Sequence, residues 1–467
     1  MPDSDIMNCN NRERKRRAKA LWQIPGRLFL VVHIPEYKKR RENIMKKWKN
    51  NLKKVTSAIL IAAMTMGLVA CGSGSSSSSS GGGDTLKVGF MSDQSGDNAL
   101  TCNVEAFQLA VDEINEAGGV LGKKIEPVIV DGQSDTQRYQ NLAKELILED
   151  NCDVVFQDGT SANREAIRST FEENKKLLIY PTFYEGGVAS RYCICTGTGP
   201  EQTILPLMQY IKDNNVGSKV YILAADYNYG QISAQWVQEY CKQLGLEVVE
   251  TEFSPLGTSQ FSSSISKIEQ SGADIVYTLL VGAAQCSFFD QWVSANVDGV
   301  ELASTCNIAY SYEQKKVAAP GLSGMLSAAN FFEDMDTDSA KKFVTDFRAK
   351  YPDEACITNQ AEAVYASVYL WKAAVEKAGT AETEAVIDAF DTDEVSVEAP
   401  SGTVKVDGAT HQAVLTVTIV QVQDDHSLKT LQTTSNIEPS YLKDLGIDIR
   451  KEDPQTQYSP LENGTGN

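Results

Sequence analysis

From Leu86 onward, short runs rich in Val, Ile, Leu and Phe alternate with amphipathic stretches of helical period. This alternation constrains the fold most, because strand, helix and strand in series form a right-handed parallel unit. Apolar residues spaced for one helical face follow the first run and end at Gly118-Gly119. The expected strands are 86–90, 127–130, 153–156 and 177–180, and two further helices are expected at 137–149 and 162–173.

A second series of the same kind begins after Gly217. Its expected strands are 220–223, 247–250, 275–279 and 301–304, and its expected helices lie near 231–244, 261–271 and 284–295. Two such units in series predict an α/β protein with two doubly wound parallel-sheet lobes, joined by a hinge and facing a cleft.

The segments after the second series are expected to return across both lobes. They hold helical patterns near 338–350 and 358–378 and strand patterns near 403–422. We therefore expect lobe one to comprise 85–200 plus about 335–390, and lobe two to comprise 201–334 plus about 391–437. The polar segment 438–467 is expected to be a loosely packed C-terminal tail.

Residues 45–70 have the organisation of a bacterial signal peptide. Met45 opens a basic stretch, and Val55–Ala70 is an apolar run, shorter than the roughly 20 residues of a membrane span. The sequence Leu68-Val69-Ala70-Cys71 resembles the lipobox of bacterial lipoproteins, in which the cysteine sulfur receives a diacylglycerol. Residues 71–84 would then be a lipidated cysteine with a flexible Ser/Gly tether. The alternative is an N-terminal membrane helix that is never cleaved.

Residues 1–44 precede a complete signal that has its own methionine. A start codon assigned too far upstream is the favoured interpretation, over a cytoplasmic extension. The signal predicts that the rest of the chain lies on the extracytoplasmic face of the cell membrane, where only the lipid contacts the membrane.

The net charge of −19 conceals an asymmetry between the signal and the exported part. The chain has 43 Lys/Arg and 62 Asp/Glu, and residues 1–71 hold 16 and 5 of these, which leaves 27 basic and 57 acidic residues beyond Cys71. Phosphate groups of nucleic acids and anionic membrane surfaces repel so acidic a body, so neither is an expected partner.

Eight cysteines lie beyond Cys71 at wide, irregular spacings, without the CxxC pairs or Cys/His clusters of zinc sites. We expect most of them to be free and buried, with one or two bridges as the alternative. Cys193 and Cys195 are expected on one face of an extended segment, too far apart for an easy bridge.

Sequence motifs for catalysis or cofactor binding are not evident beyond Cys71. The two histidines there, His411 and His426, lie far along the chain from the strand-end loops of both series, where a catalytic triad would need one. A GxGxxG turn after the first strand, a phosphate loop and a metal pattern are all lacking. The sequence therefore predicts neither an enzyme nor a resident cofactor or metal.

The loops after the strands instead carry hydroxyl and aromatic residues. Thr160-Ser161 stands where strand 153–156 passes into a helix, so it can cap that helix, or free N–H groups there can receive a ligand oxygen. Two further strand ends carry Tyr180-Pro181-Thr182-Phe183-Tyr184 and Asp226-Tyr227-Asn228-Tyr229. Several tyrosines on one rim suit a small polar ligand, because each offers an apolar ring and a hydroxyl.

A family resemblance runs through roughly residues 85–440. The chain resembles the extracytoplasmic substrate-binding proteins of ABC importers, with the type I periplasmic-binding-protein fold, in the urea and short-chain amide branch related to the branched-chain amino acid binders. The stretches that carry the resemblance are 113–122, 127–132, 160–161, 180–186, 226–227, 255–257, 331–337, 368–372 and 399–402.

The resemblance implies roles for seven residues and a partner. Ser161, Tyr180 and Thr182 match family positions that hold the oxygen end of the ligand, with Thr160 beside them, and Tyr227 closes from lobe two. Tyr184 and Tyr229 are weaker matches. The implied partners are a small-molecule ligand and the permease subunits of the importer.

Three departures from the urea branch leave the ligand open. Gly159 replaces an aromatic residue, 281–284 replaces a loop with Asn and Asp, and 310–313 replaces an acidic run. A branched-chain or other amino acid is the alternative ligand, and its ammonium group would need an acceptor, for which Asp158, Asp226 and Glu313 are candidates. A ligand-sensing receptor subunit with the same lobes is the alternative role.

Overall fold

The computed structural model describes residues 85–96, 99–306 and 317–464, which belong to one compact unit, Gly81–Asn467. The predicted signal peptide, Cys71, the tether and the segment 1–44 all lie outside the described residues. Within those three ranges, no helix has the length and apolar character needed to cross a membrane.

The first lobe is built on parallel strands in the order β2-β1-β3-β4-β6. Val88 pairs with Pro127 on one side and with Val154 on the other, so the central strand is covered on both edges. One face packs against α2 and α10, and the other face packs against α3 and α4. The elements are β1 (Thr85–Ser92), α2 (Thr101–Glu116), β2 (Lys124–Asp131), α3 (Thr136–Lys144), a π-helical turn (Glu145–Glu149), β3 (Val154–Gln157), α4 (Ser161–Asn174), β4 (Leu177–Tyr180), β5 (Val188–Ala189) and β6 (Cys193–Cys195).

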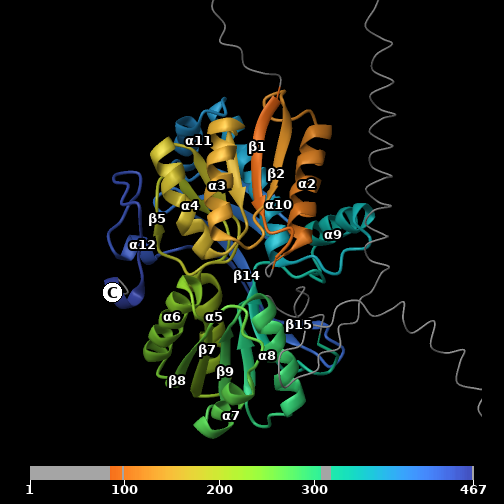
Figure 1. Cartoon of the computed structure of the whole chain (residues 1–467), viewed down its shortest axis with the longest axis vertical. Coiled ribbons are helices and arrows are strands. Elements are labelled where there is room, and N and C mark those ends of the chain that lie inside the picture. The colour runs from red at the N-terminus through yellow and green to blue at the C-terminus, as the bar shows by residue number, and fades with distance from the viewer. Residues whose placement is uncertain (1–84, 97–98, 307–316, 465–467) are drawn as a thin grey trace, which may run out of the picture. The chain divides into compact units, whose positions relative to one another are not determined.

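The second lobe repeats the arrangement with strands in the order β11-β10-β9-β7-β8. All four neighbouring pairs are parallel, and helices cover both faces of the sheet (Figure 1). The elements are α5 (Pro200–Asp213), β7 (Lys219–Ala225), α6 (Asn228–Leu244), β8 (Glu247–Ser254), α7 (Ser262–Ser271), β9 (Ile275–Leu279), α8 (Gly282–Ala295), β10 (Glu301–Ser304) and β11 (Leu326–Ala329).

One long strand, β14 (Gln412–Val422), belongs to both lobes. Its first residue pairs in parallel with Cys195 of β6, and its residues 418–421 pair antiparallel with β11. The two lobe sheets are therefore one continuous hydrogen-bonded sheet, with β14 running between them in Figure 1. The remaining elements are α9 (Asp338–Lys350), α10 (Asn359–Ala378), α11 (Thr383–Phe390), β12 (Ser396–Ala399), β13 (Gly402–Asp407), β15 (Leu428–Ile437), α12 (Tyr441–Asp444), β16 (Thr456–Gln457) and α13 (Pro460–Asn463).

The expected return of the chain to lobe two at residue 391 is wrong for its first part. β12 and β13 pair with each other, and Val404 and Val406 are buried in the same core as Leu86 and Phe90 of lobe one. The apolar positions of β13 face that core, so the chain leaves lobe one only within β14.

The expectation of a loosely packed tail is also wrong. Leu442, Ile447 and Ile449 are buried together with Ala189, and β16 forms an antiparallel pair with β5. The few apolar residues of this polar segment are spaced so that each reaches the body, which fixes the chain between them.

As expected, all eight cysteines beyond Cys71 are buried, and none of these described residues forms a disulfide bond. Cys193 and Cys195 lie on the same face of β6, within the core that also contains Cys152. They act there as small apolar side chains.

Candidate ligand-binding site

A cavity lies at the carboxyl ends of the lobe-one strands and reaches residues of lobe two. The space within its walls and open mouth is about 540 Å³, a volume that includes open solvent. Open α/β sheets bind ligands at this edge. The lining residues are Ser92, Asp93, Leu100, Asn103, Asp158, Gly159, Thr160, Ser161, Tyr180, Thr182, Phe183, Tyr227, Val281, Gly282 and Gln360.

Five of the seven predicted ligand-binding residues line this cavity: Thr160, Ser161, Tyr180, Thr182 and Tyr227. Tyr184 and Tyr229 stand behind the cavity wall instead. The Tyr184 ring packs edge-on against Tyr180, at 6.4 Å between centroids. The Tyr229 hydroxyl lies 2.6 Å from the Cys306 sulfur, inside the lobe-two core.

Of the candidate acceptors for an ammonium group that the structure describes, Asp158 lines the cavity and Asp226 does not. Asp226 is exposed outside it and accepts a hydrogen bond from Gln231 at 2.8 Å. Glu313 lies outside the described residues.

Asn103 and Gln360 also line the cavity, and no local sequence pattern pointed to either residue. Both stand in the first turn of a long helix, α2 or α10, more than 250 residues apart, and their side chains meet at 3.4 Å. Only the packing of α10 against α2 brings them to the strand ends.

Two helices begin at the cavity with N–H groups that have no intrahelical partner. Thr160 caps α4 by accepting from the Asn163 N–H at 3.3 Å, and Ser161 is the first helical residue. At α8, Val281 has no side-chain oxygen to cap the helix, and Gly282 lines the cavity. Partial positive charge from both helix ends therefore faces the same space.

The neighbours of Gly159 explain why a glycine stands where the urea branch has an aromatic residue. A Cβ atom there would lie 2.5 Å from the Tyr139 hydroxyl and 2.6 Å from the Gln157 amide nitrogen. Tyr139 is fully buried on α3, so its ring fills the space beside Gly159 that a side chain there would need.

Four hydroxyl groups of the lobe-one wall donate to other groups of the protein. Ser92 donates to the Asp158 carboxylate at 2.9 Å, and Thr182 donates to the Asp158 carbonyl at 2.8 Å. Tyr180 donates to the Gly159 carbonyl at 2.9 Å, and Ser161 donates to Glu185 at 2.6 Å. Each oxygen then offers only lone pairs to a ligand, so this wall accepts hydrogen bonds. It suits a ligand N–H group, and not the oxygen end that the resemblance implies for Ser161, Tyr180 and Thr182.

Asp158 is the charged group at the centre of that wall. Burial raises its pKa to about 7, while hydrogen bonds from Asn103 and Ser92 lower it and the nearby Asp93 raises it. Burial also raises the pKa of Asp93, which accepts from Ser134 and from the Tyr139 hydroxyl. Within the described residues, the cavity lining contains no lysine or arginine to neutralise them.

The raised pKa of Asp158 predicts how stability depends on pH without ligand. The folded protein binds the proton of the Asp158 carboxyl more tightly than the unfolded chain does, because an Asp in the unfolded chain has a pKa of about 3.9. The contribution of Asp158 to the free energy of unfolding therefore falls as the pH rises from about 4 to about 7. In the wild type, Asp158 should lower the free energy of unfolding by up to about 1.4 kcal/mol per pH unit over that window, and Asp158→Asn should abolish this pH dependence. Denaturant unfolding of both proteins at several pH values measures this, and identical slopes would contradict it.

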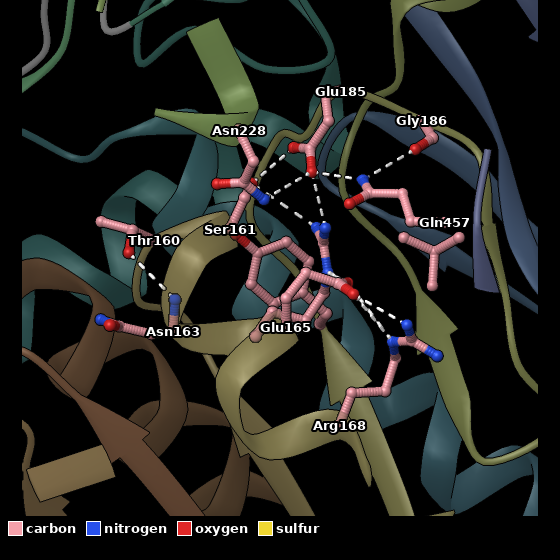
Figure 2. A network of polar contacts seen from close by, with 12 residues as sticks. Thr160, Ser161, Asn163, Glu165, Arg168, Glu185, Gly186, Asn228 and Gln457 are labelled. Atoms are coloured by element: carbon pink, nitrogen blue, oxygen red, sulfur yellow. Dashed lines mark hydrogen bonds and ion pairs between the residues drawn. The ribbon is translucent and has the colours of Figure 1, made fainter. Parts of the chain in front are cut away.

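Behind Ser161 lies an ion pair that is shielded from solvent. The side chains of Arg164 and Glu185 are both 0% exposed, and their charged groups lie 2.7 Å apart. The guanidinium also stands 4.8 Å from the centroid of the Tyr180 ring. Glu185 and other members of the polar network around this pair are labelled in Figure 2.

Groups of three or more His, Cys, Asp or Glu able to hold a metal ion are not found in the described residues. Of the two histidines, His411 is buried against Asp391 at 2.7 Å and His426 ends a turn in the left-handed region. Neither lines the cavity.

The chain matches known proteins over most of its length. The family model for the periplasmic binding protein domain matches residues 86–444. The leucine-, isoleucine-, valine-, threonine- and alanine-binding protein of Pseudomonas aeruginosa is 24% identical over 371 residues, 77% of this chain and 92% of that protein. A Leu/Ile/Val-binding protein homologue of Brucella abortus is 27% identical over 175 residues, which are 36% of this chain and 46% of that protein.

Two solved structures show the same fold. A solute binding protein of an ABC transporter from Rhodopseudomonas palustris, in complex with 3,4-dihydroxybenzoic acid, has a TM-score of 0.68 and 20% identity and covers 76% of this chain and 99% of its own. A leucine binding protein from Thermotoga maritima has a TM-score of 0.66 and 18% identity, with 75% and 99% covered. These likenesses confirm the expected two-lobed α/β architecture, and the chain belongs to the periplasmic binding protein domain family.

Proposed function

We propose that this protein is the lipid-anchored solute receptor of an ABC importer, which binds a small polar ligand between its lobes and delivers it to the permease subunits. The observation that carries the proposal is the cavity lined from both lobes, with Asp158 and Thr182 on one side and Tyr227 and Gly282 on the other. A ligand that contacts both lobes favours the closed arrangement by its differential binding energy.

The polarity of the cavity supports a ligand with N–H donors at one end and oxygen acceptors at the other. The donors would meet the hydroxyl oxygens and the carboxylate of Asp158, and the oxygens would meet the N-termini of α4 and α8. An α-amino acid has both groups. Leu100, Phe183 and Val281 add apolar surface for an apolar side chain. The names of the Pseudomonas and Brucella relatives agree with this class.

Urea or a short-chain amide is the second candidate, and one observation favours it. With a pKa of about 7, the Asp158 carboxyl is half protonated near neutral pH and can serve a ligand without charge. Against it stands the lobe-two wall, where Val281 and Gly282 offer no side-chain oxygen to amide nitrogens.

Calorimetric titration with L-leucine, L-alanine, L-threonine, acetamide, urea and 4-hydroxybenzoate separates these candidates. The amino acid proposal expects one-to-one binding of an amino acid, with affinity rising from pH 5.5 to pH 8 as Asp158 ionises against the ammonium group. Binding of acetamide or urea alone would establish the amide class, and binding of 4-hydroxybenzoate alone would contradict both.

The lipid anchor is a separate part of the proposal, because Cys71 lies outside the described residues. We expect Cys71→Ser to move the protein from the membrane fraction to the soluble fraction of cells, since the diacylglycerol needs that sulfur. Immunoblotting of the two fractions measures this, with Cys102→Ser as the matched control because Cys102 is buried in the body. A Cys71→Ser protein that stays in the membrane would instead support an uncleaved membrane helix.

A further inference from the structure

Glu185 gathers hydrogen bonds from parts of the chain that are far apart in sequence. Its carboxylate accepts from Ser161 at 2.6 Å, Arg164 at 2.7 Å, Asn228 at 3.2 Å and the Gln457 side chain. The Glu185 side chain is fully buried, so bulk water does not reach the carboxylate and these protein donors solvate it. Figure 2 labels three of these donors, Ser161, Asn228 and Gln457, around Glu185.

The donors come from both lobes. Ser161 and Arg164 lie on α4 of lobe one, and Asn228 is the first residue of α6 in lobe two, directly after the cavity residue Tyr227. The indole N–H of Trp236, also on α6, donates to the Glu185 carbonyl at 3.0 Å. Glu185 is thus bonded to lobe two through both its side chain and its backbone.

The fourth donor belongs to the C-terminal segment. Gln457 pairs with Val188 in the β16–β5 ladder, and the Tyr458 N–H donates to the Gly187 carbonyl at 2.8 Å. Farther on, the Leu461 N–H donates to the Gln235 side chain of α6 at 3.1 Å. The segment therefore spans from lobe one to lobe two, and it holds the Gln457 amide against Glu185.

The bond from Ser161 connects this network to the cavity. A carboxylate has no hydrogen to give, so the Ser161 hydroxyl must be the donor. Its oxygen also accepts from the Arg164 guanidinium at 3.5 Å, which leaves one lone pair for a ligand. The same carboxylate holds the start of α6, so the orientation of Ser161 and the position of Tyr227 depend on one group.

We propose that Glu185 is a positioning residue for ligand binding, which orients the Ser161 hydroxyl as an acceptor for a ligand N–H and is held in place by Arg164 and the C-terminal residue Gln457. This inference rests on the proposed function, because it assigns the ligand an N–H donor at Ser161. The C-terminal segment then contributes to affinity although it does not line the cavity.

A double-mutant cycle tests the coupling between Glu185 and Ser161. We expect Glu185→Gln to weaken binding of L-leucine at least tenfold, because the new amide N–H can donate to the serine oxygen and occupy its lone pair. In a Ser161→Ala background, the same change should weaken binding by a clearly smaller factor, since no hydroxyl remains to be oriented and only the effect on α6 and Tyr227 is left. An equal loss in both backgrounds would overturn the proposal. Acetamide replaces leucine as the probe if the panel shows only amides to bind.

The matched control is Glu172→Gln, on the helix α4 that also carries Ser161. Glu172 pairs with Arg168 at 2.5 Å and is also buried, but neither residue lines the cavity. We expect this variant to bind with unchanged affinity. Gln457→Ala should weaken binding less than Glu185→Gln does, and unchanged binding in Gln457→Ala would remove the C-terminal segment from the proposal.

A second measurement needs no ligand, so it separates a failure of this inference from a failure of the ligand assignment. We expect Glu185→Gln to accelerate amide hydrogen exchange in the first turn of α6 and in residues 182–187, relative to both wild type and Glu172→Gln. Unchanged exchange in those segments would overturn the claim that Glu185 holds them. If exchange accelerates but none of the panel binds, the proposed ligand classes fail and the positioning of α6 by Glu185 stands.

Discussion

Replacing Arg164 with leucine is expected to lower the free energy of unfolding by about 3–5 kcal/mol, because the variant buries the Glu185 carboxylate without its charged partner. The side chains of both residues are inaccessible to solvent, so water cannot replace the lost hydrogen bonds. Leucine also lacks the flat guanidinium that packs over Tyr180. Denaturant unfolding followed by circular dichroism, at one pH and salt concentration, measures the difference.

A second variant separates the loss of the charge from the loss of packing. In Arg164→Leu with Glu185→Leu, no unpaired charge is buried, so part of the lost stability should return. The matched single change is Arg168→Leu, whose side chain is 10% exposed and leaves Glu172 and Glu165 closer to water, so a smaller loss is expected. If Arg164→Leu lowers the free energy of unfolding less than Arg168→Leu does, the network around Glu185 is not a major source of stability.

Asp158→Asn is expected to weaken the binding of L-leucine at least a hundredfold at pH 8. The change removes the carboxylate that would face the ammonium group in a buried site, where losing one partner of a charge pair costs about 2–5 kcal/mol. Acetamide and urea carry no charge, so their affinity should change less than about tenfold. Titration of both proteins with the same solutions measures the two ratios.

Asp226→Asn is the matched control for that experiment. Asp226 also follows a buried strand, but it is exposed outside the cavity. Its replacement should leave both affinities unchanged. Equal losses from the two variants would mean that net charge, and not the position of Asp158, governs binding.

The alternation of strands and helices was predictable because each element has a strong apolar period. The strand 177–180 and the helix 338–350 have the expected bounds. The helix α5 lacked such a signal, since it begins with Pro200 and contains Pro206, and proline is a poor marker of helix interiors. The strand β15 was missed because most of its residues are polar and exposed. Its sequence therefore lacks the alternation of apolar and polar residues that marks a half-buried strand.

The candidate site was predictable where it stands at strand ends. Ser161, Tyr180 and Thr182 follow directly from strands, so their meeting at one edge of the sheet follows from topology. The direction in which each loop tyrosine points could not be predicted from the topology. The Tyr184 ring packs against Arg164, and the Tyr229 hydroxyl contacts the Cys306 sulfur, so neither side chain lines the cavity. The contact of Gln457 with Glu185 joins residues separated by 272 positions, for which a single sequence holds no local pattern.

A crystal structure of the protein with the tightest-binding member of the panel shows where the solute binds and how it is oriented. We expect the solute in the cavity between the lobes, with an N–H group about 3 Å from the Asp158 carboxylate or the Thr182 hydroxyl oxygen and its oxygens toward the start of α4 or α8. A solute bound outside this cavity, or one that turns its oxygens toward Asp158, would contradict the account.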